Sequence, residues 1–174
     1  MDRKALANKI YNVSHITGTF KLRSGQISSE YFDKYLFEAR PELLIDIADK
    51  MAKLIPAGTE VIAGLEMGGI PVAAAISMKT GIPASFVRKA AKNYGTCKLA
   101  EGADVKGKRV TLIEDVVTTG GQIIISTNDL RKLGAEVKDV LCVILRGANS
   151  RELLAKEGLN LIPLFTMEEL EANK

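Results

Sequence analysis

The fold is decided by one stretch, Val110-Thr111-Leu112-Ile113-Glu114-Asp115-Val116-Val117-Thr118-Thr119-Gly120-Gly121-Gln122. Its apolar, β-branched first part predicts a buried strand over residues 109–113, which ends in the adjacent carboxylates Glu114 and Asp115. A turn of two threonines and two glycines follows, and an amphipathic helix is expected over residues 120–133. Strand, turn and helix in this order form the unit from which parallel sheets are built.

On either side of this stretch, short apolar segments alternate with helical patterns. Strands are predicted over residues 61–64, 84–87, 137–145 and 159–165, and helices over 71–79 and 150–156, with a terminal helix capped by Thr166 and Glu169. Residues 89–108 are polar and contain three glycines, so they are predicted to form one long loop. The predicted fold class is α/β, with a mostly parallel central sheet and helices on both faces.

The first 40 residues do not follow this alternation. The spacing of Leu6, Ile10 and Val13 predicts a first helix, and strands are expected over 19–22 and 31–37, on either side of a turn. A helix from Pro41 then begins the regular pattern. We therefore predict a single domain over 1–174, with a small N-terminal lobe over 1–40 and a core over 41–174.

The chain has 174 residues, of which 47% are hydrophobic and 26% charged, with a formal net charge of +3. Its length suits one domain with one sizeable core. The mild charge argues against a dedicated nucleic-acid binder and is compatible with an anionic small substrate. No apolar run approaches the roughly 18 residues of a membrane span, and the N-terminus shows no signal-peptide core. We expect neither a nucleic-acid partner nor a membrane partner.

Two cysteines and one histidine limit the chemistry further. Cys97 and Cys142 are too few for a disulfide framework, which favours reduced thiols in a cytoplasmic protein. His15 is expected to lie, partly exposed, on the first helix. Since a catalytic triad or a multi-histidine zinc site would have to use this single histidine, we expect chemistry that needs little proton transfer by the protein.

The Thr118–Gly121 turn and the acids before it form a candidate ligand site. Open α/β sheets bind ligands beyond the carboxyl ends of their strands, and the free N–H groups at the start of a helix bind anions. Glu114 and Asp115 would accept hydrogen bonds from hydroxyl groups, while the turn would hold a phosphate. The alternative is an ordinary strand–turn–helix unit with acidic residues in a loop.

The same segment resembles the motif of type I phosphoribosyltransferases that binds phosphoribosyl pyrophosphate (PRPP). The shared pattern is an apolar strand, two acids, two apolar residues, and then threonine, a small residue and glycine. It is not a Walker loop, because no Gly-Lys-Ser/Thr follows. The resemblance implies PRPP contacts from Glu114, Asp115, Val116, Val117, Thr118, Thr119, Gly120, Gly121 and Gln122.

A second segment, residues 88–102, holds four cations within eleven residues. On its own it could be a solvated loop; beside a phosphate site it could close over a pyrophosphate and exclude water. It resembles the orotate phosphoribosyltransferase pattern Arg-Lys-x-x-Lys-x-(His or Tyr)-Gly followed by Glu-Gly. The resemblance implies PRPP contacts from Arg88, Lys89, Lys92 and Tyr94, some of them in the active site of the neighbouring subunit of a homodimer.

Residues 20–33 resemble another signature of this family, Phe-x-Leu-Lys-Ser-Gly followed by an aromatic pair. Arg23 stands where lysine is usual, which keeps the charge but not the geometry. The resemblance implies that the N-terminal lobe covers the base, with Arg23, Tyr31 and Phe32 in contact with it. Without the resemblance, the two aromatic residues would be read as the core of a strand.

Three further positions follow from the same resemblance. Gly68 lies in a glycine loop similar to the pyrophosphate loop of the family, in which some members have lysine. Arg146 matches an arginine that binds the orotate carboxylate, a pairing that suits a planar guanidinium. Thr118 would also touch orotate. A surface arginine with no ligand is the alternative at position 146.

The resemblance implies an orotate phosphoribosyltransferase, which transfers the ribose 5-phosphate of PRPP to orotate. The products are orotidine 5′-monophosphate and pyrophosphate, in the de novo biosynthesis of UMP. Lys89, Glu114 and Asp115 are the expected catalytic residues, and Mg²⁺ is expected to ride on PRPP without direct protein ligands. Two alternatives stay open: a phosphoribosyltransferase for another base, and a non-catalytic PRPP-sensing regulatory protein.

Overall fold

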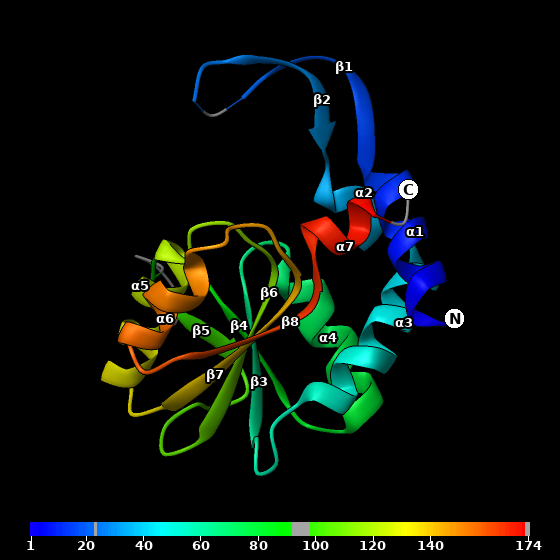
Figure 1. Cartoon of the computed structure of the whole chain (residues 1–174). Helices are drawn as coiled ribbons and strands as arrows, with labels where there is room; N and C mark the ends of the chain where they lie inside the picture. Colours follow the sequence, from blue (N-terminus) through cyan, green and yellow to red (C-terminus); the bar gives the residue numbers. More distant parts are fainter. Residues whose placement is uncertain (23, 92–97, 173–174) are drawn as a thin grey trace.

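The structure, a computed structural model, describes residues 1–22, 24–91 and 98–172. Its centre is a six-stranded sheet in the order β5-β4-β3-β6-β7-β8 (Figure 1). These strands are β3 (Val61–Leu65), β4 (Ala84–Val87), β5 (Ala100–Gly102), β6 (Arg109–Val117), β7 (Glu136–Leu145) and β8 (Asn160–Thr166). All neighbouring pairs are parallel except β4 and β5. The mostly parallel sheet confirms the predicted α/β class.

Helices cover both faces of the sheet, as predicted. One face carries α1 (Arg3–Ser14), α3 (Pro41–Met51) with the short η1 (Ala52–Leu54), and α4 (Gly69–Thr80), and the other carries α5 (Gly121–Lys132) and α6 (Ser150–Lys156) (Figure 1). The terminal α7 (Met167–Glu171) begins with the capping box expected from Thr166 and Glu169. In the ranges that the structure describes, no helix is both long and apolar enough to cross a membrane.

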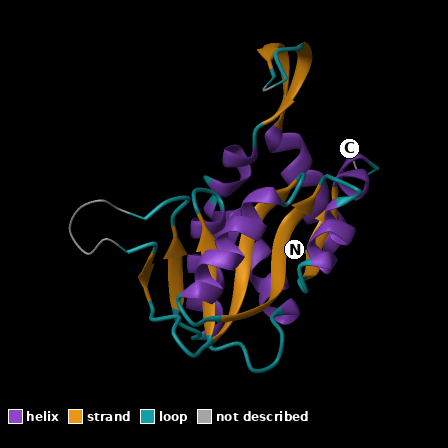
Figure 2. Cartoon of the chain, turned by 90° about the vertical axis from the view of Figure 1, so that its left-hand side faces the viewer, coloured by secondary structure: helices purple, strands orange, loops and turns teal. Residues whose placement is uncertain are grey.

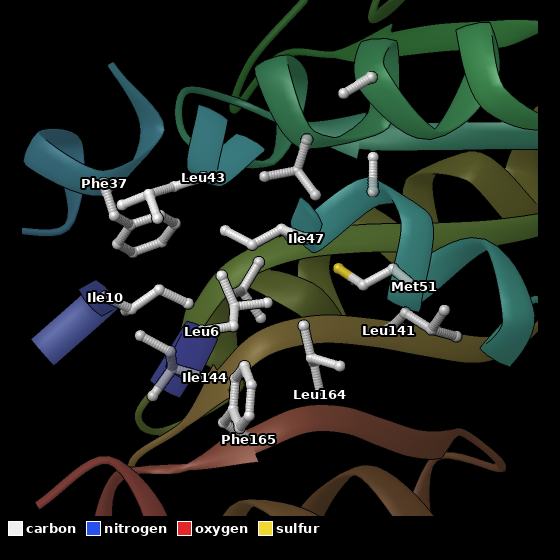
Figure 3. Close-up of a cluster of buried hydrophobic side chains, with 14 of the residues drawn as sticks. Leu6, Ile10, Phe37, Leu43, Ile47, Met51, Leu141, Ile144, Leu164 and Phe165 are labelled. Atoms are coloured by element: carbon white, nitrogen blue, oxygen red, sulfur yellow. The ribbon is translucent and has the colours of Figure 1, made fainter. Parts of the chain in front are cut away.

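Two apolar cores lie between these layers. Figure 3 shows the core under α1 and α3, where helix side chains meet those of the neighbouring strands β7 and β8. Its fully buried members include Leu6, Ile10, Ile47, Leu141 and Ile144. Full burial of such a side chain contributes about 1.5–3 kcal/mol. The helical spacing that predicted α1 and α3 therefore reflects their packing against the sheet.

The N-terminal segment contributes both to this core and to a projecting hairpin. The hairpin consists of β1 (His15–Lys21) and β2 (Ile27–Phe32), which pair antiparallel and extend away from the sheet (Figures 1 and 2). The predicted strand over 31–37 is wrong beyond Phe32, because α2 (Lys34–Glu38) begins there. The reason is a cap: the Asp33 side chain accepts a hydrogen bond from the Tyr35 N–H at 3.0 Å.

Two further boundaries differ from the prediction. β6 does not end before the acids: its pairing with β7 continues through Glu114 to Val117, so both carboxylates lie within the strand. The predicted loop over 89–108 contains β5, which pairs with β4 at the sheet edge. A three-residue strand is too short to show a period of two, so the sequence pattern could not reveal it.

The structure also shows where the single histidine and one of the two cysteines lie. His15 is the first residue of β1 and not, as expected, part of the first helix. Cys142 is a free, buried thiol in β7, and burial raises its pKa strongly. Cys97 lies outside the described residues.

The strand order creates one topological switch point. From β3 the chain proceeds to β4 on one side, and β6 then pairs with β3 on the other side. The connections after β3 and β6 therefore diverge, which leaves a crevice beyond the carboxyl ends of these two strands. The loop at residues 66–68 and the turn at residues 118–120 meet there.

Candidate active site

A cavity of about 260 Å³ lies at this switch point. It is lined by Lys34, Glu66, Lys89 and Glu114, together with the run 116–123. The structure thus brings together most of the residues expected to contact PRPP. Lys34 and Glu66 were not among the residues identified from the sequence.

The turn between β6 and α5 supplies the anion-binding part of this cavity. Thr118 and Thr119 are exposed, and Gly120 has a φ of +79°, which a residue with a side chain adopts only with strain. Gly120 is the N-cap of α5, a helix of 12 residues, whose first N–H groups have no carbonyl partner within the helix. Free N–H groups and two hydroxyls at one helix end can hold a phosphate.

The two adjacent acids of β6 occupy different environments. Side chains of successive strand residues point to opposite faces, and Glu114 lines the cavity while the Asp115 side chain is completely buried. Asp115 Oδ2 lies 2.5 Å from Lys34 Nζ, and its Oδ1 accepts a hydrogen bond from the Val116 N–H. We expected both acids to be open to ligand hydroxyls; in the structure Lys34 stands over Asp115.

These contacts leave Asp115 as the ionised member of the group. Burial alone would raise the pKa of Asp115, but its interactions with Glu114, Lys34 and Glu38 outweigh burial and lower that pKa. Burial, followed by the Asp115 charge, raises the pKa of Glu114 well above its ordinary value. One carboxylate and one ammonium therefore form the charged centre of the cluster.

Gly68, predicted as a pyrophosphate-loop residue, packs directly against this centre. A Cβ atom at this position would lie 1.6 Å from Asp115 Oδ2 and 2.7 Å from Glu38 Oε1. A side chain therefore cannot fit without displacing the buried carboxylate. The loop beyond β3, which contains a cis peptide bond between Glu66 and Met67, reaches the acid through the glycine backbone.

Glu38 is a buried acid that sequence reasoning missed. Glu38 is only 9% exposed. Burial, and to a lesser extent the neighbouring Asp115, raises the pKa of Glu38 to about 9. Lys34 and Glu38 lie four residues apart on α2, so both side chains lie on one side of that helix. This spacing was the available signal, and the interpretation of residues 31–37 as a strand concealed it.

The raised pKa of Glu38 predicts a pH-dependent stability. The folded protein holds a proton on Glu38 that the unfolded chain releases above about pH 4.5. The free energy of unfolding therefore decreases as pH rises from about 4.5 toward 9. Glu38→Gln should therefore gain thermal stability relative to the wild type between pH 5 and 9, by about 2–4 °C per kcal/mol. Glu42→Gln, at an exposed position in the first turn of α3, is the control. Equal melting temperatures of Glu38→Gln and the wild type at every pH would contradict the assignment.

The basic segment is placed in part. Lys89 donates a backbone hydrogen bond to Glu66 Oε1 at 2.8 Å, and it lines the cavity of its own chain. Arg88 is turned elsewhere: its Nε lies 3.9 Å from Glu101 Oε1, on the neighbouring strand β5. Lys92 and Tyr94, like Arg23 of the hairpin, lie outside the described residues.

Three of the five residues predicted to bind the base meet in a second cavity, of about 210 Å³, at the foot of the hairpin. Tyr31, Phe32 and Arg146 line it together with His15, whose ring is stacked on that of Tyr11. The backbone N–H of Arg146 donates a hydrogen bond to the Val117 carbonyl at 2.8 Å, so this arginine lies next to the phosphate turn. Thr118 lines the switch-point cavity, and not this one.

Comparison with known proteins agrees with this arrangement. Residues 37–166 match the phosphoribosyl transferase domain family. An orotate phosphoribosyltransferase of Nocardioides sp. is 55% identical to this chain over 167 residues, which cover 96% of this chain and 93% of the relative. The chain belongs to the orotate phosphoribosyltransferases.

Solved structures of orotate phosphoribosyltransferases share the whole fold. The Mycobacterium tuberculosis H37Rv protein in complex with Fe(III) dicitrate matches with a TM-score of 0.88 and 32% identity, over 98% of this chain and 99% of that chain. The same protein in complex with PRPP matches with a TM-score of 0.84 and 29% identity, over 98% and 99% of the two chains. The family and fold predicted from the sequence are thereby confirmed.

Proposed function

We propose that the protein transfers the ribose 5-phosphate group of PRPP to orotate, giving orotidine 5′-monophosphate and pyrophosphate, as a step of UMP biosynthesis. The observation that carries this proposal is the switch-point cavity, which is lined by a phosphate-binding turn, the acid Glu114 and the cation Lys89. A ligand with a phosphate at one end, ribose hydroxyls in the middle and a pyrophosphate at the other matches this distribution of groups.

Each part of the cavity has a proposed role. The N–H groups at residues 119–122 and the two threonine hydroxyls hold the 5′-phosphate, while Glu114 accepts hydrogen bonds from the ribose. Lys89, near the Gly68 loop, stabilises the charge of the departing pyrophosphate. Orotate enters from the hairpin side, where Tyr31 and Phe32 border its ring and Arg146 binds its carboxylate. Positioning and charge stabilisation supply the catalysis, without a histidine base.

Mg²⁺ is the proposed cofactor, carried by the oxygens of PRPP. Within the described ranges, no three His, Cys, Asp or Glu side chains are grouped so that they could hold a metal ion. Glu66 and Glu114 line the cavity, and their carboxyl oxygens can accept hydrogen bonds from the coordinated waters that Mg²⁺ retains. The ion would neutralise pyrophosphate charge, while the protein orients the ligand.

We further propose a homodimer with shared active sites, in which Lys92 and Tyr94 act in the neighbouring subunit, as the family resemblance implies. The hairpin over residues 15–32 is proposed to cover the base. A cytoplasmic location is proposed because PRPP carries several charges, whose transfer into a membrane is costly. Neither a nucleic acid nor a membrane is a proposed partner.

Product formation with a panel of bases tests the proposed reaction. The full-length protein, PRPP and Mg²⁺ are incubated with orotate, uracil, adenine or hypoxanthine, and pyrophosphate release is measured. We expect release with orotate alone. A faster reaction with a purine would assign another base, and PRPP binding without turnover on any base would indicate a regulatory protein.

Arg146→Ala should weaken orotate binding far more than PRPP binding. A charge-assisted hydrogen bond to a carboxylate contributes about 1.5–3 kcal/mol, so the KM for orotate should rise roughly ten- to hundredfold. The KM for PRPP should change by less than about threefold on the same scale. The control is Arg40→Ala, because Arg40 is exposed and its ion pair with Glu42 is long, at 3.9 Å. Equal rises in both KM values would contradict the role of Arg146.

A further inference from the structure

Lys34 occupies a position that the reaction described above does not explain. It lies on α2, which follows the hairpin and lies outside the segment that matches the phosphoribosyl transferase domain family. Its Nζ is paired with Asp115, and its side chain, 32% exposed, also lines the switch-point cavity beside Lys89 and Glu114. The same ammonium therefore touches a buried acid and an open ligand cavity.

The pairing closes Asp115 to any ligand. The Asp115 side chain has no exposed surface, because Lys34 covers it from α2 and the Gly68 backbone packs against it. A ribose hydroxyl can donate a hydrogen bond to Asp115 only after the ammonium has moved. The exposed part of Lys34 gives it room to move, since a lysine side chain has four rotatable bonds.

We propose that Lys34 is a PRPP-binding residue that exchanges partners when the substrate arrives. In the empty site its ammonium is the counterion of Asp115. In the loaded site the ammonium donates to a phosphate oxygen of PRPP, and a ribose hydroxyl donates to Asp115 in its place. In both states each charged group keeps a polar partner: the ammonium is always paired with an anion, and Asp115 accepts a hydrogen bond first from the ammonium and then from the hydroxyl. This inference rests on the proposed PRPP site.

The charges around Lys34 favour this exchange. The acids facing it are Asp115 and Glu114 on β6 and Glu38 on its own helix, and its neighbour Tyr35 adds a ring 5.2 Å from Nζ. Burial lowers the pKa of Lys34, but its interactions with Asp115 outweigh burial and raise that pKa. The ammonium is therefore charged at neutral pH and available to an incoming phosphate.

Direct binding of PRPP separates this role from a merely structural one. Calorimetric titration of the full-length protein with PRPP and Mg²⁺ should show a Kd about ten- to hundredfold higher for Lys34→Met than for the wild type. Lys34→Arg should stay within about threefold. Lys34→Gln can still donate a hydrogen bond to Asp115 but lacks the charge, so it should lose as much affinity for PRPP as Lys34→Met. If the methionine variant does not fold, the glutamine variant provides the same test.

A matched control is Lys79→Met, which removes a similarly short ion pair, Lys79 Nζ to Asp49 Oδ1 at 2.6 Å. Lys79 lies in the last turn of α4 and does not line the cavity. It should bind PRPP as the wild type does. Without Lys34 the pKa of Asp115 rises, so the acidic limb of PRPP binding should move to higher pH in Lys34→Met. Wild-type affinity and pH dependence in folded Lys34→Met or Lys34→Gln would overturn the role of Lys34. A wild-type protein that binds no PRPP would overturn the proposed function itself.

Discussion

Asp115→Asn should lower turnover at saturating substrates by about a hundred- to thousandfold, while the protein stays folded. Asp115 is the acid that the site keeps ionised, with Lys34 against it and the pKa lowered. Once a ribose hydroxyl replaces Lys34, this charge lies beside the sugar, whose reacting carbon becomes positive as pyrophosphate leaves. Asparagine has nearly the same shape, so packing against Gly68 is kept and the charge alone is removed.

The measurement is the rate of orotidine 5′-monophosphate formation, together with a thermal melt that confirms folding. Asp129→Asn is the control, because Asp129 is paired with Lys132 on the surface of α5, away from the cavity. Its turnover should equal that of the wild type. A folded Asp115→Asn protein with wild-type turnover would contradict the placement of the acid at the reacting sugar.

Mixing Asp115→Asn with Lys92→Ala should restore activity that neither variant has alone. If Lys92 acts in the partner's site, a heterodimer of these two chains holds one site with both residues intact and one site with both missing. Two-fold symmetry then allows up to about half the activity of a wild-type dimer. The variants are exchanged by mild denaturation and refolding, heterodimers are isolated by differential tags, and turnover per dimer is measured.

The structure supplies a matched negative pair for this experiment. Lys89 lines the cavity of the chain that also provides Asp115, so a heterodimer of Asp115→Asn and Lys89→Ala has one defect in each site. That pair should stay inactive. An inactive Asp115→Asn and Lys92→Ala heterodimer, with its formation confirmed, would mean that the basic segment acts within its own chain.

The alternating strands and helices of the core could be predicted from the sequence, because the spacing of apolar residues shows which side of each element is buried. β6, its turn and α5 were identified from one stretch, and the order of strands and helices around them followed from length and apolar spacing. The family resemblance added the expected roles of Lys89 and Arg146, which periodicity cannot provide. The structure places Lys89 at the switch-point cavity and Arg146 beside the hairpin aromatics. Their roles stay predictions.

The sequence could not predict the features that depend on contacts between distant segments. α2 is an exception whose cause is local: the aromatic residues between 31 and 37 favour a strand, whereas the Asp33 side chain caps a helix. The burial of Asp115 depends on Lys34, which is 81 residues away in the chain. Sequence spacing carries no information about a pair so far apart. The i, i+4 spacing of Lys34 and Glu38 was a local signal, but the strand predicted over residues 31–37 concealed it.

A crystal structure of the protein with PRPP and Mg²⁺ would test directly whether PRPP binds at the switch point between β3 and β6. We predict that the 5′-phosphate lies within hydrogen-bonding distance of the N–H groups at residues 119–122, that a ribose hydroxyl donates to Asp115, and that Lys34 Nζ donates to a phosphate oxygen. PRPP bound elsewhere, for example in the cavity beside Arg109 and Lys138 at the amino ends of β6 and β7, would contradict it.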